Sequence, residues 1–313
     1  MTILITGGKG MIGKAFTKAL LEKNYTVIIV TRSLEKQTSV PGLKYANWNI
    51  RDQTIDADAI AEADHIIHLA GAGVADKRWT AKRKKEIVNS RVKSGELLIK
   101  ALKEIPNKVR TVISASGIGW YGPDLTPGPS PKGKESGFVE NDPSYNDFLG
   151  QTCKQWEGSL DPLLQIGKRL VKLRTGIVLS KEGGALKEFE KVLRFGIAAI
   201  LGNGKQVMSW IHIDDLVRIY IMAIENEKIK GVYNAVAPYP VINKKLVLTL
   251  AEEKKGKFFV PVYVPSFVLK MVLGEMSIEV LKSVTVSGKK IHDAGFVFQY
   301  PHIEAAFKNL YTD

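Results

Sequence analysis

Short apolar runs alternate with helical patterns through the first two thirds of the chain. The run Ile3–Ile5 has the length of a buried parallel strand, and Phe16, Ala19 and Leu20 follow at the spacing of a helix. Further apolar runs predict strands at 25–30, 43–49, 65–69, 109–116, 169–179 and 210–213. This alternation is typical of an α/β fold. We therefore expect a doubly wound parallel sheet, the Rossmann fold.

Helices are predicted between these strands, and the last third of the chain changes character. The expected helices are 56–63, 81–103, 147–167 with an interruption at Pro162, 186–195, and 214–226 capped by Asp214-Asp215. The tail has short helical patterns at 243–254, 267–273, 278–282 and 303–310, and a strand pattern at 258–262. We expect a dinucleotide-binding domain at 1–235 and a smaller, mainly helical lobe at 236–313, to which residues 175–210 contribute.

The first turn of the chain carries the strongest chemical signal. Gly7, Gly10 and Gly13 lie between a strand and a helix, where side chains would hold the backbone away from a pyrophosphate. The free N–H groups behind the turn, those of Met11 and Ile12 included, attract an anion. Two alternatives are a phosphate loop of nucleotide hydrolases, which requires Ser or Thr where Ala15 stands, and a turn that only allows close packing.

The end of the second strand indicates which dinucleotide binds. NAD-binding folds place a carboxylate about 20 residues past the glycines, to accept hydrogen bonds from the ribose. This chain has Thr31, Arg32 and Ser33 there, which favours NADP(H), because Arg32 can pair with a 2′-phosphate. The alternative is a surface arginine at a strand end. The small residues that end the strand at 65–69 also allow close approach, so we add three cofactor candidates: Leu69, Ala70 and Gly71.

Composition limits the other classes of function. The 313 residues include one cysteine, Cys153, which excludes a disulfide framework and a multi-cysteine metal site. The net charge of +13 raises the possibility of nucleic-acid binding, but the basic residues are spread along the chain, and Lys82–Lys85 reads as a solvated helix face. We expect no nucleic-acid partner, no membrane span and no metal. The first strand begins at residue 2, which leaves no room for a signal peptide and favours the cytoplasm.

Several motifs resemble the extended short-chain dehydrogenase/reductase family. They are Thr6-Gly7-Gly8-x-Gly10-x-Ile12-Gly13, His68-Leu69-Ala70, the Ser116 to Tyr121-Gly122 turn, Arg174 and Ile211-His212-Ile213-Asp214-Asp215. Further motifs, among them Ser90-Arg91-Val92, Gly183-Gly184-Ala185-Leu186 and Leu273-Gly274-Glu275-Met276, resemble an atypical branch described as NAD-dependent nucleotide-sugar epimerases with a C-terminal domain of unknown function. The resemblance covers nearly the whole chain, and it implies that a homodimer is one option.

The chain departs from that family at the catalytic pair. Family members use Tyr-x-x-x-Lys, in which the lysine lowers the pKa of the tyrosine so that the phenol can exchange a proton. No tyrosine here has a lysine four residues later. Alignment on Trp156-Glu157 puts Leu149 and Cys153 at the two positions. The usual acid and base are therefore absent.

Other residues could supply the missing chemistry. Ser116 and Tyr121 flank the turn where the family has its catalytic Ser or Thr, so both are catalytic candidates; Tyr121 could instead pack beside the nicotinamide. Substrate-pocket candidates are Arg174, Trp210 and His212, although His212 also fits a hydrogen-bonded structural histidine. The region 123–143 is rich in Pro, Gly and Lys, which predicts a long loop that serves as a lid or clamp, or is disordered.

Two functions remain open at this point. The first is an NADP(H)-dependent oxidoreductase or epimerase-like enzyme with a non-standard proton donor, acting on a small substrate. The arginines suggest that this substrate is anionic: Arg78, Arg91, Arg174 and Arg194. The second is a catalytically silent NADP(H)-binding sensor or scaffold, which the loss of the tyrosine and lysine supports.

Overall fold

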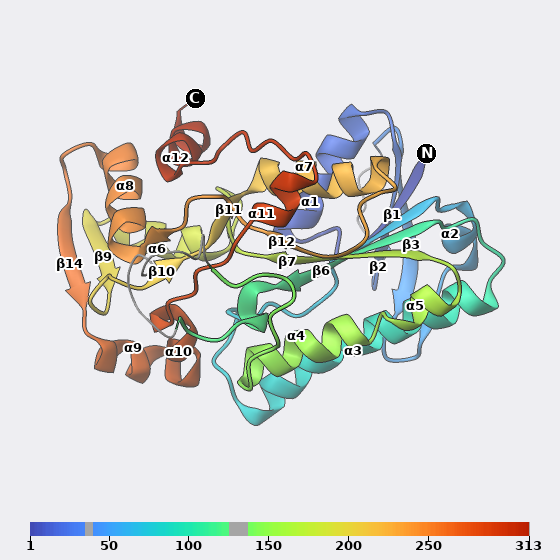
Figure 1. Ribbon diagram of the computed structural model, residues 1–313, viewed down its shortest axis with the longest axis horizontal. Coiled ribbons are helices and arrows are strands. Elements are labelled where there is room, and N and C mark those ends of the chain that lie inside the picture. The colour runs from blue at the N-terminus through green and yellow to red at the C-terminus, as the bar shows by residue number, and fades with distance from the viewer. Residues whose placement is uncertain (35–39, 125–136, 313) are drawn as a thin grey trace.

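The computed structural model describes residues 1–34, 40–124 and 137–312, and its centre is an eight-stranded sheet (Figure 1). The strand order is β12-β7-β6-β5-β1-β2-β3-β4, and every pair is parallel except β3 with β4. The bounds are β1 Thr2–Thr6, β2 Thr26–Thr31, β3 Leu43–Asn49, β4 Thr54–Ile55, β5 His65–His68, β6 Thr111–Gly117, β7 Arg169–Thr175 and β12 Gly231–Ala235. The expected doubly wound parallel sheet is confirmed.

The strand order reverses direction at β1. The chain goes from β1 to β2 and β3 on one side, then returns to β5 on the other, with Thr6 of β1 in register with His68 of β5. In open α/β sheets, ligands bind outside the carboxyl ends of the strands at such a switch point. The glycine turn after β1 and the small residues after β5 both lie at this edge.

Helices cover both faces of the sheet (Figure 1). Phe16, Leu216 and Tyr220 belong to the apolar core on one face, and Ile60, Leu98 and Leu163 to the core on the other. The first face carries α1 Met11–Glu22, α7 Ile213–Glu225 and α11 Lys289–Asp293; the second carries α2 Ala57–Glu62, α3 Ala81–Glu104, α4 Phe148–Gly158 and α5 Pro162–Gln165. The break between α4 and α5 confirms the predicted interruption at Pro162.

A third apolar core joins residues 179–210 to the tail. It includes Trp210, Leu246 and Phe307, each no more than 1% exposed. Its elements and their neighbours are β8 Ile177–Leu179, α6 Ala185–Leu193, β9 Ile197–Leu201, β10 Val207–Met208, β11 Trp210–His212, β13 Val241–Ile242, α8 Asn243–Lys255, β14 Val260–Val264, α9 Ser266–Leu273, η2 Gly274–Met276, α10 Ser277–Leu281 and α12 Ile303–Tyr311. A boundary at residues 235 and 236 stays a prediction.

Some expectations about elements are wrong. The predicted strand 169–179 is two strands, because the backbone changes partner after Gly176: the Gly176 N–H bonds the Ala235 carbonyl at the end of β12, whereas the Ile177 N–H bonds the Ser209 carbonyl beside β11. The first turn of α7 is capped by His212, whose Nδ1 accepts from the Asp214 N–H, and not by the two aspartates. The predicted strand 258–262 begins two residues later, and β9 and β12 were not predicted at all.

The ends of the long loop are tied to the tail. Asp124 accepts hydrogen bonds from the Ser283 and Thr285 hydroxyls, and the Phe138 backbone pairs with residues 285 and 287. The prediction of a lid or clamp falls mostly on residues 125–136, which lie outside the described residues. In the part of the chain that the structure describes, no helix is long and apolar enough to cross a membrane.

Candidate functional site

The glycine turn brings the backbone of two strand ends together. Gly7 has a φ of 72°, and a Cβ there would lie 2.9 Å from the carbonyl carbon of Leu69. A Cβ on Gly13 would lie 2.5 Å from the Gly7 carbonyl oxygen and 2.5 Å from the Cα of Gly8. The close packing of turn and helix therefore requires these glycines.

The N-terminus of α1 is open toward this turn. Gly10 is its N-cap and provides no side-chain hydrogen bond, and the first turn of the helix contains no acidic residue. The first N–H groups of a helix have no partner within it, and the helix dipole favours an anion there. The sequence-predicted residues Met11, Ile12 and Gly13 thus lie where a pyrophosphate fits by its chemistry.

Replacing Gly13 by alanine is expected to destabilise the protein, although alanine is the better helix former. The added Cβ forces the turn away from α1, which should lower the free energy of unfolding by about 1–3 kcal/mol. Gly158→Ala is the matched control, because that helical glycine has nothing within 4 Å of an added Cβ. Urea unfolding checks both; equal effects of the two substitutions would contradict the packing argument.

A hydrogen-bond chain fixes the end of β5 to the glycine turn. Ser94 Oγ donates to the Arg91 carbonyl and lies 3.3 Å from His68 Nε2, so His68 donates to Ser94. His68 Nδ1 then accepts from Thr6 Oγ1, at 2.8 Å, and this oxygen accepts from the N–H groups of Leu69 and Ala70. Burial, with a smaller effect of the Arg91 charge, lowers the pKa of His68 to about 3, which keeps the imidazole neutral.

Two cations lie where β2 ends. Arg32 is exposed, and Lys9 in the glycine turn donates from its Nζ to the Ser33 carbonyl oxygen at 3.3 Å. Thr31 is buried, and its hydroxyl also donates to that oxygen. Residues 31–33 were predicted from the sequence, whereas Lys9 was not. The only signal was a basic residue inside the glycine turn, and only the fold brings it to the Ser33 carbonyl.

The positions that the family resemblance assigns to the catalytic pair face the turn after β6. A Cβ on Gly119 would lie 3.0 Å from the Cβ of Leu149, and Cys153 Sγ lies 3.6 Å from the Gly117 carbonyl oxygen. Burial raises the pKa of Cys153 to about 11, so its thiol stays protonated near neutral pH. Neither side chain can serve as the tyrosine or the lysine of the family pair.

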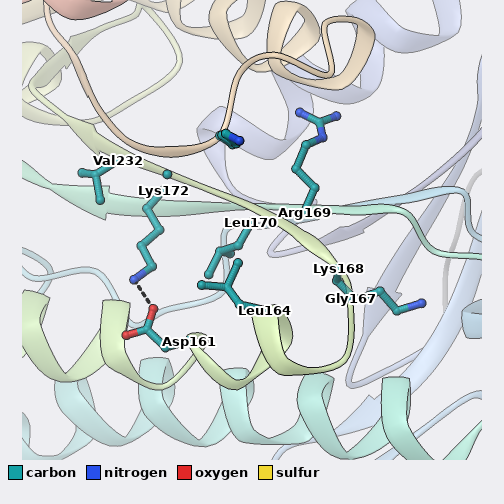
Figure 2. Close-up of a pocket in the computed structure, with 10 residues that line it drawn as sticks. Asp161, Leu164, Gly167, Lys168, Arg169, Leu170, Lys172 and Val232 are labelled. Atoms are coloured by element: carbon teal, nitrogen blue, oxygen red, sulfur yellow. Dashed lines mark hydrogen bonds and ion pairs between the residues drawn. The ribbon is translucent and has the colours of Figure 1, made fainter.

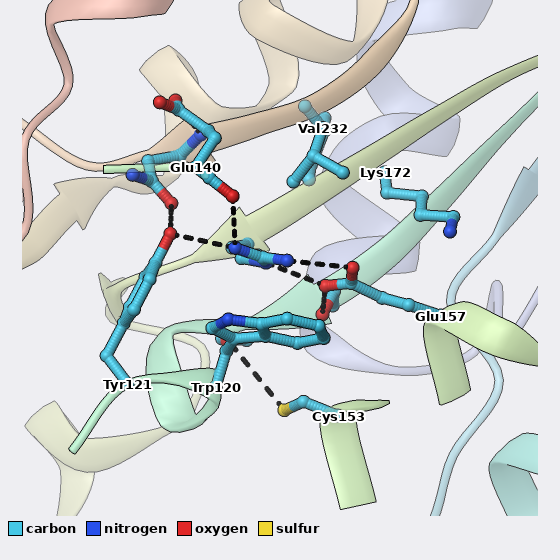
Figure 3. Close-up of polar contacts among 12 residues, drawn as sticks. Trp120, Tyr121, Glu140, Cys153, Glu157, Lys172 and Val232 are labelled. Atoms are coloured by element: carbon cyan, nitrogen blue, oxygen red, sulfur yellow. Dashed lines mark hydrogen bonds and ion pairs between the residues drawn. The ribbon is translucent and has the colours of Figure 1, made fainter. Parts of the chain in front are cut away.

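Ser116 and Arg174 both bind the buried carboxylate of Glu157 on α4. Figure 3 labels Glu157 beside Trp120 and Tyr121. Ser116 Oγ donates to Glu157 Oε1 at 2.7 Å, while Arg174 donates from Nε and Nη2 to the two carboxylate oxygens at 2.8 and 3.0 Å. The Arg174 guanidinium also lies 3.6 Å from the centre of the Trp120 ring. Burial alone lowers the pKa of Arg174, but the hydrogen bonds and charge of Glu157 raise it above its ordinary value.

Tyr121 belongs to the same network. It is 0% exposed, donates to Asn234 Oδ1 at 2.7 Å and accepts from Arg174 Nη1 at 3.0 Å. Burial raises its pKa to about 12. It also stacks on Phe138, with 5.1 Å between ring centres. This geometry favours the packing role of Tyr121 over proton donation, and its catalytic role, like that of Ser116, stays a prediction.

The other substrate-pocket candidates are enclosed by protein. Trp210 is 0% exposed and donates to the Tyr239 carbonyl, and His212 is 1% exposed and caps α7. His212 also lies against the Tyr300 ring, and burial lowers its pKa. The structure thus brings Arg174 together with the catalytic candidates, but it holds Trp210 and His212 apart from them in other contacts. No group of three or more metal-ligating side chains occurs in residues 1–34, 40–124 and 137–312.

A second polar cluster, which the sequence analysis missed, joins the tail to α4. Lys282 donates to Asp147, the N-cap of α4, and to the Tyr121 carbonyl oxygen, and it pairs with Glu279 at 2.9 Å. Burial raises the pKa of Glu279 against the opposing effect of Lys282. Residues more than 130 positions apart therefore meet at the N-cap of α4, two residues before Leu149.

A groove in the described part of the chain lies away from this edge. It measures about 600 Å³ and is lined by residues at the beginnings of β7 and β12, Arg169 and Gly231 among them (Figure 2). Lys172 pairs with Asp161 on its wall. Because α/β sheets bind ligands at the carboxyl ends of their strands, this groove is not the candidate active site.

Comparison with known proteins agrees with the fold and the glycine turn. The NAD-dependent epimerase/dehydratase family model matches residues 3–143 and 186–235, and a domain of unknown function (DUF1731) matches residues 264–310. An epimerase family protein of Staphylococcus saprophyticus is 34% identical over 98% of both chains. A chloroplastic SDR39U1 homologue of Arabidopsis thaliana is 31% identical over 99% of this chain and 86% of its own.

A solved structure extends the similarity over the whole chain. The human epimerase family protein SDR39U1, solved with NADPH, has a TM-score of 0.84 and 28% identity, with full coverage of both chains. The family description names NAD, and this relative was solved with NADPH, which supports a nicotinamide cofactor. The chain therefore belongs to the NAD-dependent epimerase/dehydratase family.

Proposed function

We propose that this protein binds NADP(H) and works as an oxidoreductase or epimerase-like enzyme without a tyrosine–lysine pair. The observation that carries the proposal is that Lys9 of the glycine turn donates to the carbonyl oxygen of Ser33, the residue after Arg32, at a strand end that has no carboxylate. Two cations fit a 2′-phosphate, whereas a ribose hydroxyl is bound by an acidic residue. The human relative solved with NADPH gives further support.

The chain's own residues have defined tasks in this proposal. A bound nicotinamide supplies hydride transfer. Gly7 and Gly13 let the backbone approach the pyrophosphate, and the N–H groups of Met11 and Ile12 hold it. The Thr6 to His68 hydrogen-bond chain holds Leu69 and Ala70 at the same edge. Leu149 has no titratable group, and the Cys153 thiol, whose pKa burial raises and which donates to the Gly117 carbonyl, is a poor acid. We therefore expect the proton to come from elsewhere.

A silent NADP(H) sensor or scaffold is the second candidate function. It is favoured by one observation: the hydroxyls of Ser116 and Tyr121 both donate to buried protein acceptors. A residue whose proton is already committed and whose pKa is raised by burial is a poor general acid. The enzyme function therefore needs a proton donor other than these two side chains, or a substrate that carries its own acidic group.

A fluorescence titration of the purified protein with NADPH and NADH tests the cofactor. We expect NADH to bind at least about tenfold more weakly, since a lost charge-assisted contact is worth more than about 1.4 kcal/mol. Absence of binding for both would overturn both functions. The wild-type protein is then mixed with NADPH and a metabolite extract, and NADPH fluorescence is followed over time. Loss of fluorescence that Gly13→Ala abolishes would support the enzyme. Unchanged fluorescence with the wild-type protein would support the sensor.

A further inference from the structure

Arg91 on α3 differs from the other deeply buried arginines. Of the arginines in the described ranges that are at least nine-tenths buried, Arg83 pairs with Asp76 and Glu86, and Arg174 pairs with Glu157. Arg91 is 9% exposed and has no carboxylate within ion-pair distance among those residues. The charge of Asp76 also acts on Arg91, but this carboxylate is paired with Arg83. A buried cation without an ion-pair partner is costly, so Arg91 calls for an anion.

Only one of the three guanidinium nitrogens of Arg91 donates hydrogen bonds to described residues. Nη1 donates to the carbonyl oxygens of Ala72 and Ile87, each at 2.9 Å. Nε and Nη2 make no hydrogen bond to any described residue. The fully enclosed polar atoms without a partner belong to five other side chains in the described chain, so Nε and Nη2 of Arg91 are not completely enclosed.

The position of Arg91 places this open fork at the cofactor edge. A Cβ on Gly71 would lie 3.0 Å from its Cζ, so the guanidinium rests directly on the backbone that follows β5. On its other side it lies 4.8 Å from the centre of the Trp156 ring, on the helix that carries Cys153. The Cys153 thiol, protonated because burial raises its pKa, supplies no counter-charge.

We propose that Arg91 is a binding residue that holds an oxyanion, a phosphate or a carboxylate, between Gly71 and α4. The flat fork of a guanidinium suits such a group through paired hydrogen bonds. The anion comes either from a phosphate of the cofactor or from the substrate. This inference rests on the proposed function for its ligand, because Gly71 belongs to the edge to which we assign the cofactor.

Phosphate binding by calorimetry, with the full-length protein, tests the proposal. Arg91→Gln should weaken the binding of inorganic phosphate at least about tenfold, whereas Lys93→Gln, an exposed residue on the same helix, should leave it unchanged. Arg91→Lys keeps the positive charge but loses the planar guanidinium, so its phosphate affinity should lie between those of the other two variants. This variant replaces Arg91→Gln in the test if the glutamine variant does not fold. Equal phosphate binding by the wild-type and a folded Arg91→Gln protein, or none by the wild type, would overturn the proposal.

The source of the anion follows from repeating the titration with saturating NADPH. Loss of the Arg91-dependent phosphate binding assigns the site to a cofactor phosphate, and its persistence assigns the site to the substrate; both support an oxyanion site. Failure of the proposed function is seen separately. A protein that binds no NADPH but shows Arg91-dependent phosphate binding would overturn the cofactor assignment and leave the anion site standing.

Discussion

Replacing Arg32 by alanine will weaken NADPH binding about tenfold, and replacing Lys9 as well will weaken it about a hundredfold, with NADH binding changed less than about twofold. The reason is that we assign both cations to the 2′-phosphate, which only NADPH carries, and each charge-assisted contact is worth about 1.5–3 kcal/mol. Titrations of the single and double variants with both cofactors measure the effect.

Arg110→Ala is the matched control for this experiment. Arg110 is exposed and directly precedes β6, at the opposite edge of the sheet from the glycine turn, so its removal changes the net charge by the same amount. The Arg110→Ala variant should bind NADPH within about twofold of the wild-type affinity, because charges separated by more than about 10 Å are largely screened at ordinary salt. A parallel loss of NADPH and NADH affinity in the Arg32 variant would contradict its role as the phosphate reader.

The cofactor edge was predictable because its signals are local. A strand, three glycines and a helix lie within 22 residues, and the end of β2, to which we assign the choice of cofactor, follows at a fixed distance. Lys9 was missed because its role depends on a contact that is not local in the sequence. Its contact with the Ser33 carbonyl depends on how β1 and β2 pair, and nothing in the order of residues near Lys9 reports that pairing.

The polar residues beyond β6 were found, but their partners were not. The sequence identified Ser116, Tyr121 and Arg174 as chemically active types near strand ends, yet Glu157 and Asn234 come from elements 41 and 113 residues away from the residues that they bind. These residues form a buried hydrogen-bond network only because the fold brings distant elements together, which the sequence alone does not show. Arg91 shows the opposite outcome: its neighbours leave part of the guanidinium without a partner.

Replacing Glu157 by glutamine will lower the free energy of unfolding by about 3–5 kcal/mol. The side chains of Arg174 and Glu157 are only 3% and 6% exposed, so a neutral amide leaves a buried guanidinium without its counter-charge. The same substitution places an NH₂ group near donors from Ser116 and Arg174, which now lack one acceptor. Urea unfolding followed by circular dichroism gives the free-energy difference.

Asp161→Asn is the comparison that separates burial from charge pairing. Asp161 pairs with Lys172 on the strand that also carries Arg174, but its side chain is 55% exposed, and exposed pairs contribute only about 0–1 kcal/mol. The loss at Glu157 should therefore exceed the loss at Asp161 several-fold. If the two variants lose the same stability, the Glu157 carboxylate is not the counter-charge that stabilises the buried Arg174 guanidinium.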